Sequence, residues 1–457
     1  MTVKALMPAP ILNLVAPLPH EGTDMHATET AGHVRARPGA VSPVIGHGLR
    51  QGDVESAHRR STRTTTPGIR TSTTATRTTT TRALSSAPEP SADSTLFEEL
   101  VAAYLDCRRT KRNSASALAF EANLERNLCD LHDELASGIY SPGRSICFVI
   151  TRPKPREVWA AEFRDRIVHH LLYRHISPRF YASFTADSCA CIPGRGTLYA
   201  AKRLEHQVRS ATQNWSQPAH YLKCDLANFF VSIRKPVVLQ LLAKRVTEPW
   251  WLDLTERVLM HDPRHDVEVR GRTDLLSLVP PHKSLFNAPA DQGLPIGNLS
   301  SQFFANVLLD VLDQHVKHRL RAPHYVRYVD DFVLVHQSPQ WLNHALADIT
   351  AMLPARLGLQ LNPSKTILQR VDHGIDFVGH VLKPWRRTTR PRTLRTALRR
   401  LADMPAEDVF AAGNSYLGLV RQASHSHTAQ VQIAQALLAR GHCVNATFTK
   451  AFRKTPT

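Results

Sequence analysis

Residues 326–335 have the sequence Val326-Arg-Tyr-Val-Asp330-Asp331-Phe-Val-Leu-Val335. β-Branched and aromatic residues flank two adjacent aspartates, a pattern that predicts two strands joined by a tight turn. Such a hairpin would hold both carboxylates at its tip on a rigid scaffold. Because like charges at this spacing repel one another, the arrangement favours a bound divalent cation. The alternative is an ordinary hairpin turn that contains aspartate.

A second stretch lies upstream and has the sequence Leu222-Lys-Cys-Asp225-Leu-Ala-Asn-Phe-Phe230. It is typical of a strand that ends in an acid, although an aspartate that closes a strand is also common turn chemistry. Together the two stretches supply three carboxylates, Asp225, Asp330 and Asp331. Oxygen ligands of this kind suit Mg²⁺, which binds few carboxylates together with substrate phosphates. Two such ions can activate an attacking hydroxyl and stabilise a leaving pyrophosphate.

The composition narrows the class of protein. The chain has 457 residues and a formal net charge of +18 at pH 7, which favours a polyanionic partner. Its 7 cysteines include no C-x-x-C pair, which argues against a zinc module and a disulfide scaffold. No apolar run is long enough to span a bilayer, and prolines interrupt the apolar stretch near the N-terminus. We therefore expect a cytoplasmic protein without a membrane partner.

The chain divides into a low-complexity part and a patterned part. Residues 1–94 are expected to be disordered, because the segment from Arg59 to Arg82 is nearly all Thr, Arg and Ser. This extension is either a tail that attracts nucleic acid or a segment without a role. Periodicity in the remainder predicts a strand at Ile146–Ile150 and helices over Leu96–Leu135, Arg164–His175 and Thr393–Arg440, the last interrupted near Pro405 and His425.

Further motifs, in order and spacing, resemble those of the reverse transcriptase family. The matching stretches are Lys154-Pro-Arg156-Glu, Phe163-Arg164-Asp165-Arg166, Ile192-Pro-Gly-Arg195-Gly-Thr, the strand with Asp225, Gly293-Leu-Pro-Ile-Gly297-Asn-Leu-Ser-Ser-Gln302, Tyr328 to Asp331, Leu359-Gln-Leu-Asn-Pro-Ser-Lys365-Thr and Phe377-Val-Gly-His. The resemblance implies an α/β (α+β) right-hand polymerase. Its expected parts are the disordered extension at 1–94, fingers at 95–220, a palm of antiparallel sheet and helices at 221–385, a helical thumb at 386–445 and a tail at 446–457.

The resemblance also implies roles for single residues. Asp225 and Asp330 would be the principal ligands of two Mg²⁺ ions, or of Mn²⁺ as a substitute, with Asp331 and the Leu226 carbonyl in support. The residues expected to contact the nucleotide are Arg156, Arg195, Phe230, Ile296, Gly297, Gln302 and Lys365, and those expected to contact template or primer are Lys154, Tyr328, Gly379, Arg395 and Arg399.

Several of these roles have alternatives in the sequence. The two arginines proposed for the triphosphate would suit bidentate phosphate contacts, but each could instead be a surface residue or part of an ion pair. Phe230 would exclude a 2′-hydroxyl, or else it is a core residue. Lys365 would lie near the leaving pyrophosphate, or else it is a solvated loop lysine. The arginines of the thumb could likewise form a solvated helix face.

The expected reaction is the templated addition of dNTPs to a primer 3′-end, copying RNA into DNA on a DNA or RNA primer. A catalytically inactive nucleic-acid-binding scaffold is the non-enzyme alternative. In most of the family Gln occupies the position of Ile296, and the motif ends in Ser-Pro, whereas here Ser301-Gln302 closes it. This departure resembles the diversity-generating retroelement enzymes, which make adenine-mutagenic cDNA with a small basic accessory protein. Phage-defence (antiviral), retron and reduced group II intron enzymes remain alternatives.

Overall fold

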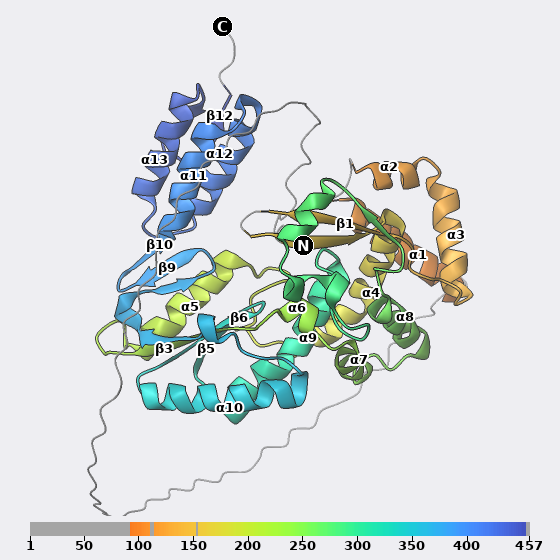
Figure 1. The fold of residues 1–457 in the computed structure, drawn as a ribbon, viewed down its shortest axis with the longest axis horizontal. Helices are drawn as coiled ribbons and strands as arrows, with labels where there is room; N and C mark the ends of the chain where they lie inside the picture. The colour runs from red at the N-terminus through yellow and green to blue at the C-terminus, as the bar shows by residue number, and fades with distance from the viewer. Residues whose placement is uncertain (1–91, 110–113, 152–153, 454–457) are drawn as a thin grey trace, which may run out of the picture. The chain divides into compact units, whose positions relative to one another are not determined.

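The structure, a computed structural model, describes residues 92–109, 114–151 and 154–453. The expected disordered extension lies outside these ranges except for its last residues, 92–94, which begin helix α1 (Ala92–Arg108). None of the described helices is both long enough and apolar enough to cross a lipid bilayer. The expected mixed α/β architecture, with antiparallel sheets and many helices, is confirmed (Figure 1).

A four-stranded antiparallel sheet carries the acidic residues, and its strand order is β5-β6-β3-β7. The strands are β3 (His220–Asp225), β5 (His324–Tyr328), β6 (Asp331–His336) and β7 (Ile367–Arg370). β5 and β6 form the predicted hairpin, with only two residues between them. Strand β6 also pairs with β3, in the register that places Asp225 opposite Asp331. The sheet therefore brings the two acidic stretches, far apart in sequence, to one edge.

Strand β6 is buried on both faces, which explains why Phe332-Val-Leu-Val335 is apolar throughout. Alternate residues of the strands belong to two separate cores. Leu222 and Leu334 pack in the core that includes α10 (Pro339–Leu357), whereas Tyr221 and Val333 pack in the core that includes α5 (Thr197–Ala211). Strands β3, β5 and β6 are thus packed on both faces, whereas the edge strand β7 is mostly exposed.

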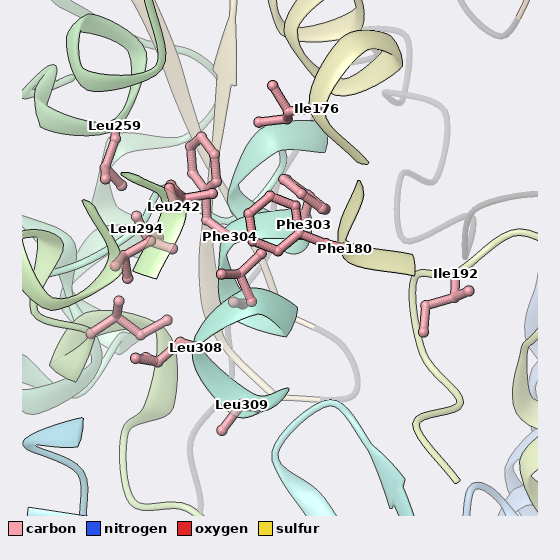
Figure 2. Packing of buried hydrophobic residues seen from close by; sticks show 14 of the residues in the cluster. Ile176, Phe180, Ile192, Leu242, Leu259, Leu294, Phe303, Phe304, Leu308 and Leu309 are labelled. Carbon is pink, nitrogen blue, oxygen red and sulfur yellow. The ribbon is translucent and has the colours of Figure 1, made fainter. Parts of the chain in front are cut away.

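Helix α9 (Leu299–Gln314) is buried on nearly all sides and forms the centre of the larger core. Figure 2 shows Phe303, Phe304 and Leu308 of this helix beside Phe180 of α4 (Phe163–Tyr181) and Leu242 of α7 (Lys235–Ala243). The rings of Phe180 and Phe303 meet edge to face, with centroids 5.5 Å apart. Because α9 begins at the end of the Gly293–Gln302 motif, this packing anchors that motif.

The N-terminal part of the described chain contains the helices predicted between Leu96 and Leu135. They are α1, α2 (Ala115–Glu121) and α3 (Leu124–Ala136), and they precede a small sheet of order β2-β1-β4. The strands of this sheet are β1 (Ser145–Ile150), β2 (Arg156–Ala161) and β4 (Val267–Val269). Strand β4 follows α8 (Pro249–Met260) and pairs in parallel with β1. The sequence analysis did not predict β4 or the three 3₁₀ turns after it, Thr273–Leu278, Pro281–Lys283 and Leu285–Asn287.

A second small sheet connects the central sheet to three helices. It contains β8 (Ile375–Phe377), β9 (His380–Lys383) and β10 (Arg386–Thr389), and the helices are α11 (Pro391–Asp403), α12 (Ala406–Val420) and α13 (His427–Ala439). The predicted helix breaks near Pro405 and His425 fall between these helices. The remaining short elements are a π-helical turn at His315–Arg319 and 3₁₀ turns at Pro363–Lys365 and Val371–His373.

The sequence analysis expects a tail at 446–457, whereas in the structure residues 446–453 include a strand and a buried contact. Strand β12 (Ala451–Phe452) pairs with β11 (Cys443–Val444), and Ala451 is fully buried against the three helices. The side chain of Asn414 explains this docking, because its Oδ1 accepts from the Ala451 amide at 2.9 Å and its Nδ2 donates to the Ala451 carbonyl at 3.3 Å. The helical unit therefore extends past residue 445, through contacts that the local sequence pattern does not reveal.

Candidate active site

Three carboxylates meet where β3 ends and β6 begins. Asp225 is the last residue of β3 and lies opposite Asp331, the first residue of β6. Asp330 lies in the turn between β5 and β6, and its carbonyl accepts from the Leu226 amide at 3.2 Å. The residue that follows β3 is thus hydrogen-bonded directly to Asp330 in the turn. The structure brings together the four residues that the sequence analysis assigned to the metal site.

Two lysines contact this cluster. Lys365 Nζ lies 2.6 Å from Asp225 Oδ2, and Lys223 Nζ lies 3.2 Å from Asp331 Oδ2. Lys223 also donates to the Asp376 carbonyl in β8 at 2.7 Å. Lys365 is about half exposed, with 49% of its side chain accessible, whereas Lys223 is largely covered. Lys365 can therefore change partners more easily than Lys223.

The pKa values of two of the carboxylates, Asp330 and Asp331, are raised. Burial raises the pKa of Asp330, the negative charge of Asp225 raises it further, and Lys365 and Arg156 act in the opposite direction. Burial likewise raises the pKa of Asp331 to about 6, although Lys223 lowers it and the other two aspartates add to the rise. These carboxylates lie near one another with less positive charge than full ionisation requires.

The donor set suits a magnesium ion that arrives with a nucleotide. Within the described ranges, no group of three or more His, Cys, Asp or Glu side chains is placed to hold a metal ion by itself. Mg²⁺ nevertheless needs only one or two protein carboxylates when water and substrate phosphates complete its shell. Asp331 Oδ1 is buried and has no hydrogen-bond partner among the described residues. Lys223 contacts only the other oxygen, Oδ2, so Oδ1 is left as a buried acceptor that a cation could use.

The Gly293–Gln302 motif packs between β2 and the segment after Asp225. The Leu294 amide donates to the Phe230 carbonyl, and the Trp159 amide of β2 donates to the Ile296 carbonyl at 2.7 Å. Gly297 has φ +137°, and a Cβ there would lie 2.4 Å from the Trp159 carbonyl oxygen. Only glycine fits this close approach. The structure therefore gives Gly297 a packing reason, separate from the nucleotide contact expected for it.

Phe230 is only partly buried, unlike its neighbour Phe229, which is 3% exposed. Both belong to the short helix α6 (Phe229–Ser232), and their rings meet edge to face at 5.2 Å. Phe229 is part of the larger core, whereas Phe230 packs against that core and stays partly exposed. Gln302 and Ile296 are also partly buried.

The two arginines expected to grip a triphosphate have different surroundings. Arg156 is exposed at the start of β2, and its charge acts on the pKa of Asp330. Arg195 Nη1 instead donates to the carbonyls of Thr185 and Ser188 at 2.6 and 2.7 Å. Nη1 of Arg195 is therefore bonded to the backbone at 185 and 188, so only Nε and Nη2 could contact a phosphate.

The residues expected to contact template and primer lie on separate elements. Tyr328 ends β5 and is half buried, with burial raising its pKa to about 12. Gly379 has φ +87° in the two-residue turn between β8 and β9. Lys154 is exposed just before β2, and Arg395 and Arg399 are exposed on α11. The structure does not place these two arginines in contact with the acidic cluster.

Two charged residues near the cluster were missed by the sequence analysis. Lys223 precedes Asp225 by two positions and so shares its face of β3. Arg327 is a charged residue inside an otherwise apolar strand, and it forms a buried ion pair with Asp313 of α9. Strand periodicity could have revealed the first. An arginine between Val326 and Tyr328 signalled the second, but its partner could not be found without the fold.

Comparison with known proteins shows a matching family model and a related bacterial protein. A family model described as reverse transcriptase (RNA-dependent DNA polymerase) matches residues 153–382. Protein YkfC of Escherichia coli (strain K12) is 24% identical over 328 residues, which are 64% of this chain and 79% of that protein.

Two solved telomerase structures from yeasts also match. The telomerase of Candida albicans, in complex with the TWJ fragment of telomeric RNA, matches with 13% identity and a TM-score of 0.41, covering 71% of this chain and 58% of that chain. The apo telomerase of Candida tropicalis, truncated from its C-terminal domain, matches with 14% identity and a TM-score of 0.38, covering 53% and 54%. The chain thus spans little more than half the length of either telomerase chain.

Proposed function

Because the chain belongs to the reverse transcriptase family, whose model matches residues 153–382, we propose that it is an RNA-directed DNA polymerase. It adds dNTPs to the 3′-end of a DNA or RNA primer paired with an RNA template. The observation that carries this proposal is the meeting of Asp225, Asp330 and Asp331 at adjoining strand ends. Clustered carboxylates without enough local positive charge suit metal-assisted phosphoryl transfer and have no use in an inactive scaffold.

In this proposal Asp225 and Asp330 hold two Mg²⁺ ions, for which Mn²⁺ can substitute, with the Leu226 carbonyl and Asp331 in support. When bound there, the ions supply Lewis-acid activation of the primer 3′-hydroxyl and charge stabilisation for the leaving pyrophosphate. Lys223 keeps Asp331 oriented through its contact at 3.2 Å. The chain's own part is to hold these oxygens on two hydrogen-bonded strands, so that little reorganisation is needed during the reaction.

The nucleotide lies beside this cluster in the proposal. Arg156 is exposed and electrostatically coupled to Asp330, so it suits the role of a triphosphate contact. Lys365, half exposed beside Asp225, would be the residue that donates a proton to the leaving pyrophosphate. Arg195 contributes with the nitrogens that do not hold residues 185–188. Ile296, Gly297 and Gln302 line the base pair.

Phe230 selects the sugar in this proposal. Its partial exposure beside the buried Phe229 supports a steric role, because a ring committed to the core would be covered. Replacing Phe230 with Ala is expected to raise the efficiency of rNTP use relative to dNTP by at least about tenfold, the scale of one lost steric contact. The test is to measure kcat/KM for dNTP and for rNTP with the wild-type protein and with Phe230→Ala. An unchanged ratio would assign Phe230 to packing alone.

Template and primer would be held by parts further from the acidic cluster. We propose the division into fingers at 95–220, palm at 221–385 and thumb from 386, with the thumb extended to residue 453. Lys154, Tyr328 and Gly379 would contact the strands near the site, and Arg395 and Arg399 would follow the backbone from α11. Exposed arginines on one helix suit phosphate contacts that do not depend on sequence.

Primer extension on an RNA template tests the polymerase activity. Purified protein is incubated with an annealed DNA primer, dNTPs and Mg²⁺, with an EDTA arm and an arm that holds rNTPs only. Extension that requires Mg²⁺ and dNTPs would support the proposal. Tight binding to the annealed RNA without extension, under either Mg²⁺ or Mn²⁺, would favour the inactive scaffold instead.

A finer proposal concerns fidelity. Ile296 can make only apolar contacts with the nascent base pair, whereas a Gln at this position could hydrogen-bond it. Incorrect base pairs are therefore excluded less strictly. This supports placement among the diversity-generating retroelement enzymes, with adenine-mutagenic cDNA and a small basic accessory protein. Sequencing of cDNA is expected to show errors concentrated opposite template adenines, and Ile296→Gln is expected to reduce them. Uniformly low error at all four bases would favour a phage-defence, retron or intron-derived enzyme.

A further inference from the structure

The guanidinium of Arg327 is 1% exposed, yet all five of its N–H groups have acceptors. Nε and Nη2 donate to the two carboxylate oxygens of Asp313, each at 2.7 Å. Nη2 also donates to Ser188 Oγ at 2.7 Å, and Nη1 donates to Asn306 Oδ1 at 3.2 Å and to the Val329 carbonyl at 3.1 Å. We call these five residues the Arg327 network. It joins α9, the chain at 188 and the turn before Asp330.

The turn that this network contacts has an unfavourable conformation. Val329 has φ +55°, which is rare for a β-branched residue, whereas Asp330 is not among the described residues with positive φ. A positive φ at the first central position alone matches a type II′ turn, where glycine is the preferred residue. A valine there persists only when its surroundings hold it. The bond from Arg327 to the Val329 carbonyl is one such restraint.

The network also reaches the loop that precedes Arg195. The Cys189 amide donates to the Arg327 carbonyl at 2.9 Å, and the Ser188 carbonyl accepts from Arg195 Nη1 at 2.7 Å. Asn306 Nδ2 donates to the Ala190 carbonyl at 2.9 Å. Hydrogen bonds therefore run without a break from Arg195, through residues 188–190, to the turn that carries Asp330.

We propose that Arg327 is a positioning residue for the reaction, which holds the Val329–Asp330 turn in its strained conformation and ties it to the loop held by Arg195. This inference rests on the proposed polymerase function. It assigns to Arg327 no contact with substrate or metal. Its effect passes through the position of Asp330, whose carboxylate must lie within coordination reach of an ion shared with Asp225.

Stability alone does not explain the arrangement. Replacing a buried ion pair with apolar residues of similar volume is often neutral or stabilising, so a core at this place does not need charge. A lysine would keep the charge but could not reach both oxygens of Asp313 and the Val329 carbonyl together, because its three donors share one nitrogen. The planar fork of arginine meets all these acceptors at once.

The first test compares Arg327→Lys with Arg203→Lys. Arg203 is a control for the same substitution at a partly exposed arginine of the same region: its Nε donates to Asp187 at 2.7 Å, and 31% of its side chain is accessible, against 1% for Arg327. Three quantities are measured: hydrogen exchange of the peptide covering 326–331, Mn²⁺ affinity by electron paramagnetic resonance, and kcat and KM for dNTP. For Arg327→Lys we expect faster exchange, weaker Mn²⁺ binding and a kcat lower by about 10- to 100-fold with little change in KM. The control should leave all three near wild type.

A second variant separates positioning from folding. The double substitution Arg327→Met with Asp313→Leu removes the ion pair without leaving a buried charge, so the protein is expected to fold. Faster exchange over 326–331 and reduced kcat in this folded variant would support the proposal. Unchanged exchange and kcat would overturn it, and so would the same result in a folded Arg327→Lys.

The outcome also distinguishes this inference from the proposed function. If the wild-type protein bound Mn²⁺ but extended no primer, the polymerase function would fail. Exchange and Mn²⁺ affinity would still test whether Arg327 positions the turn. If wild type extends primers and neither variant changes exchange, Mn²⁺ affinity or kcat, the function stands and the positioning role is rejected.

Discussion

Two clusters of buried charge lie at opposite ends of one short turn and differ in how they are balanced. In the Arg327 network, the carboxylate of Asp313 is matched by a guanidinium in a bidentate contact, and each N–H has an acceptor. In the acidic cluster, Asp330 and Asp331 both have raised pKa values, and Asp331 Oδ1 lacks a partner among the described residues.

This difference separates a cluster that fixes local geometry from a cluster that can bind a cation. A charged group that is fully paired fixes geometry but offers nothing to a ligand. A carboxylate cluster left short of positive charge destabilises the fold slightly and attracts a cation. The two clusters are joined at the turn, where Arg327 donates to the Val329 carbonyl beside Asp330, and in our proposal this bond holds the acidic cluster in place. Three substitutions test this contrast, and they follow in order of decreasing expected effect.

The largest effect is expected from breaking the balanced pair. Asp313→Asn would leave the Arg327 charge buried without a counter-ion and lower the free energy of unfolding by about 3–5 kcal/mol. Chemical denaturation measures this change. Asp372→Asn is the control, because it removes an exposed partner of Arg370 and should change stability by less than about 1 kcal/mol. Similar losses in both variants would show that Asp313 is not specially important.

Removing a carboxylate from the acidic cluster is expected to lower activity but to raise the stability of the metal-free protein. Asp330→Asn removes a proposed metal ligand and should lower primer extension by about 100-fold or more, equivalent to about 2.7 kcal/mol of transition-state stabilisation. It also removes a carboxylate whose pKa is raised, so the protein in EDTA should unfold at a slightly higher denaturant concentration. Near wild-type extension by this variant would remove Asp330 from the proposed site.

The smallest effect concerns pH. Burial raises the pKa of Asp331 from its ordinary value of 3.8 to about 6, so the folded state binds a proton more tightly than the unfolded state. Its contribution to stability is therefore fully present below the unfolded pKa and is lost as pH rises through about 6.

Asp331→Asn should flatten this dependence and stabilise the metal-free protein above pH 6 by on the order of 1–2 kcal/mol. Denaturation in EDTA at about pH 4.5 and about pH 7.5 measures both slopes. Asp253→Asn serves as a control, since that carboxylate is exposed on α8 beside Arg257. The idea fails if wild type and Asp331→Asn show the same change in stability between the two pH values.

Much of the acidic cluster could be predicted because its signal is local. A run of β-branched and aromatic residues on each side of Asp330 and Asp331 indicates a hairpin, and β5 and β6 form that hairpin. The helix breaks near Pro405 and His425 also follow from local residues and agree with α11, α12 and α13. The role of Arg195 was harder to foresee, because its Nη1 partners are backbone carbonyls, which any sequence could supply.

The hairpin and its carboxylates could be read from the sequence alone, since hydrophobic periodicity and turn residues act over a few positions. The class of fold followed instead from the ordered motifs that resemble the reverse transcriptase family. The contacts between distant segments depend on the tertiary structure. It set the register that places Asp225 opposite Asp331, paired Lys223 with Asp331 and buried Arg327 against Asp313. These contacts join segments far apart in the chain, and their partners are chosen by how sheet and helices pack, which no local pattern records.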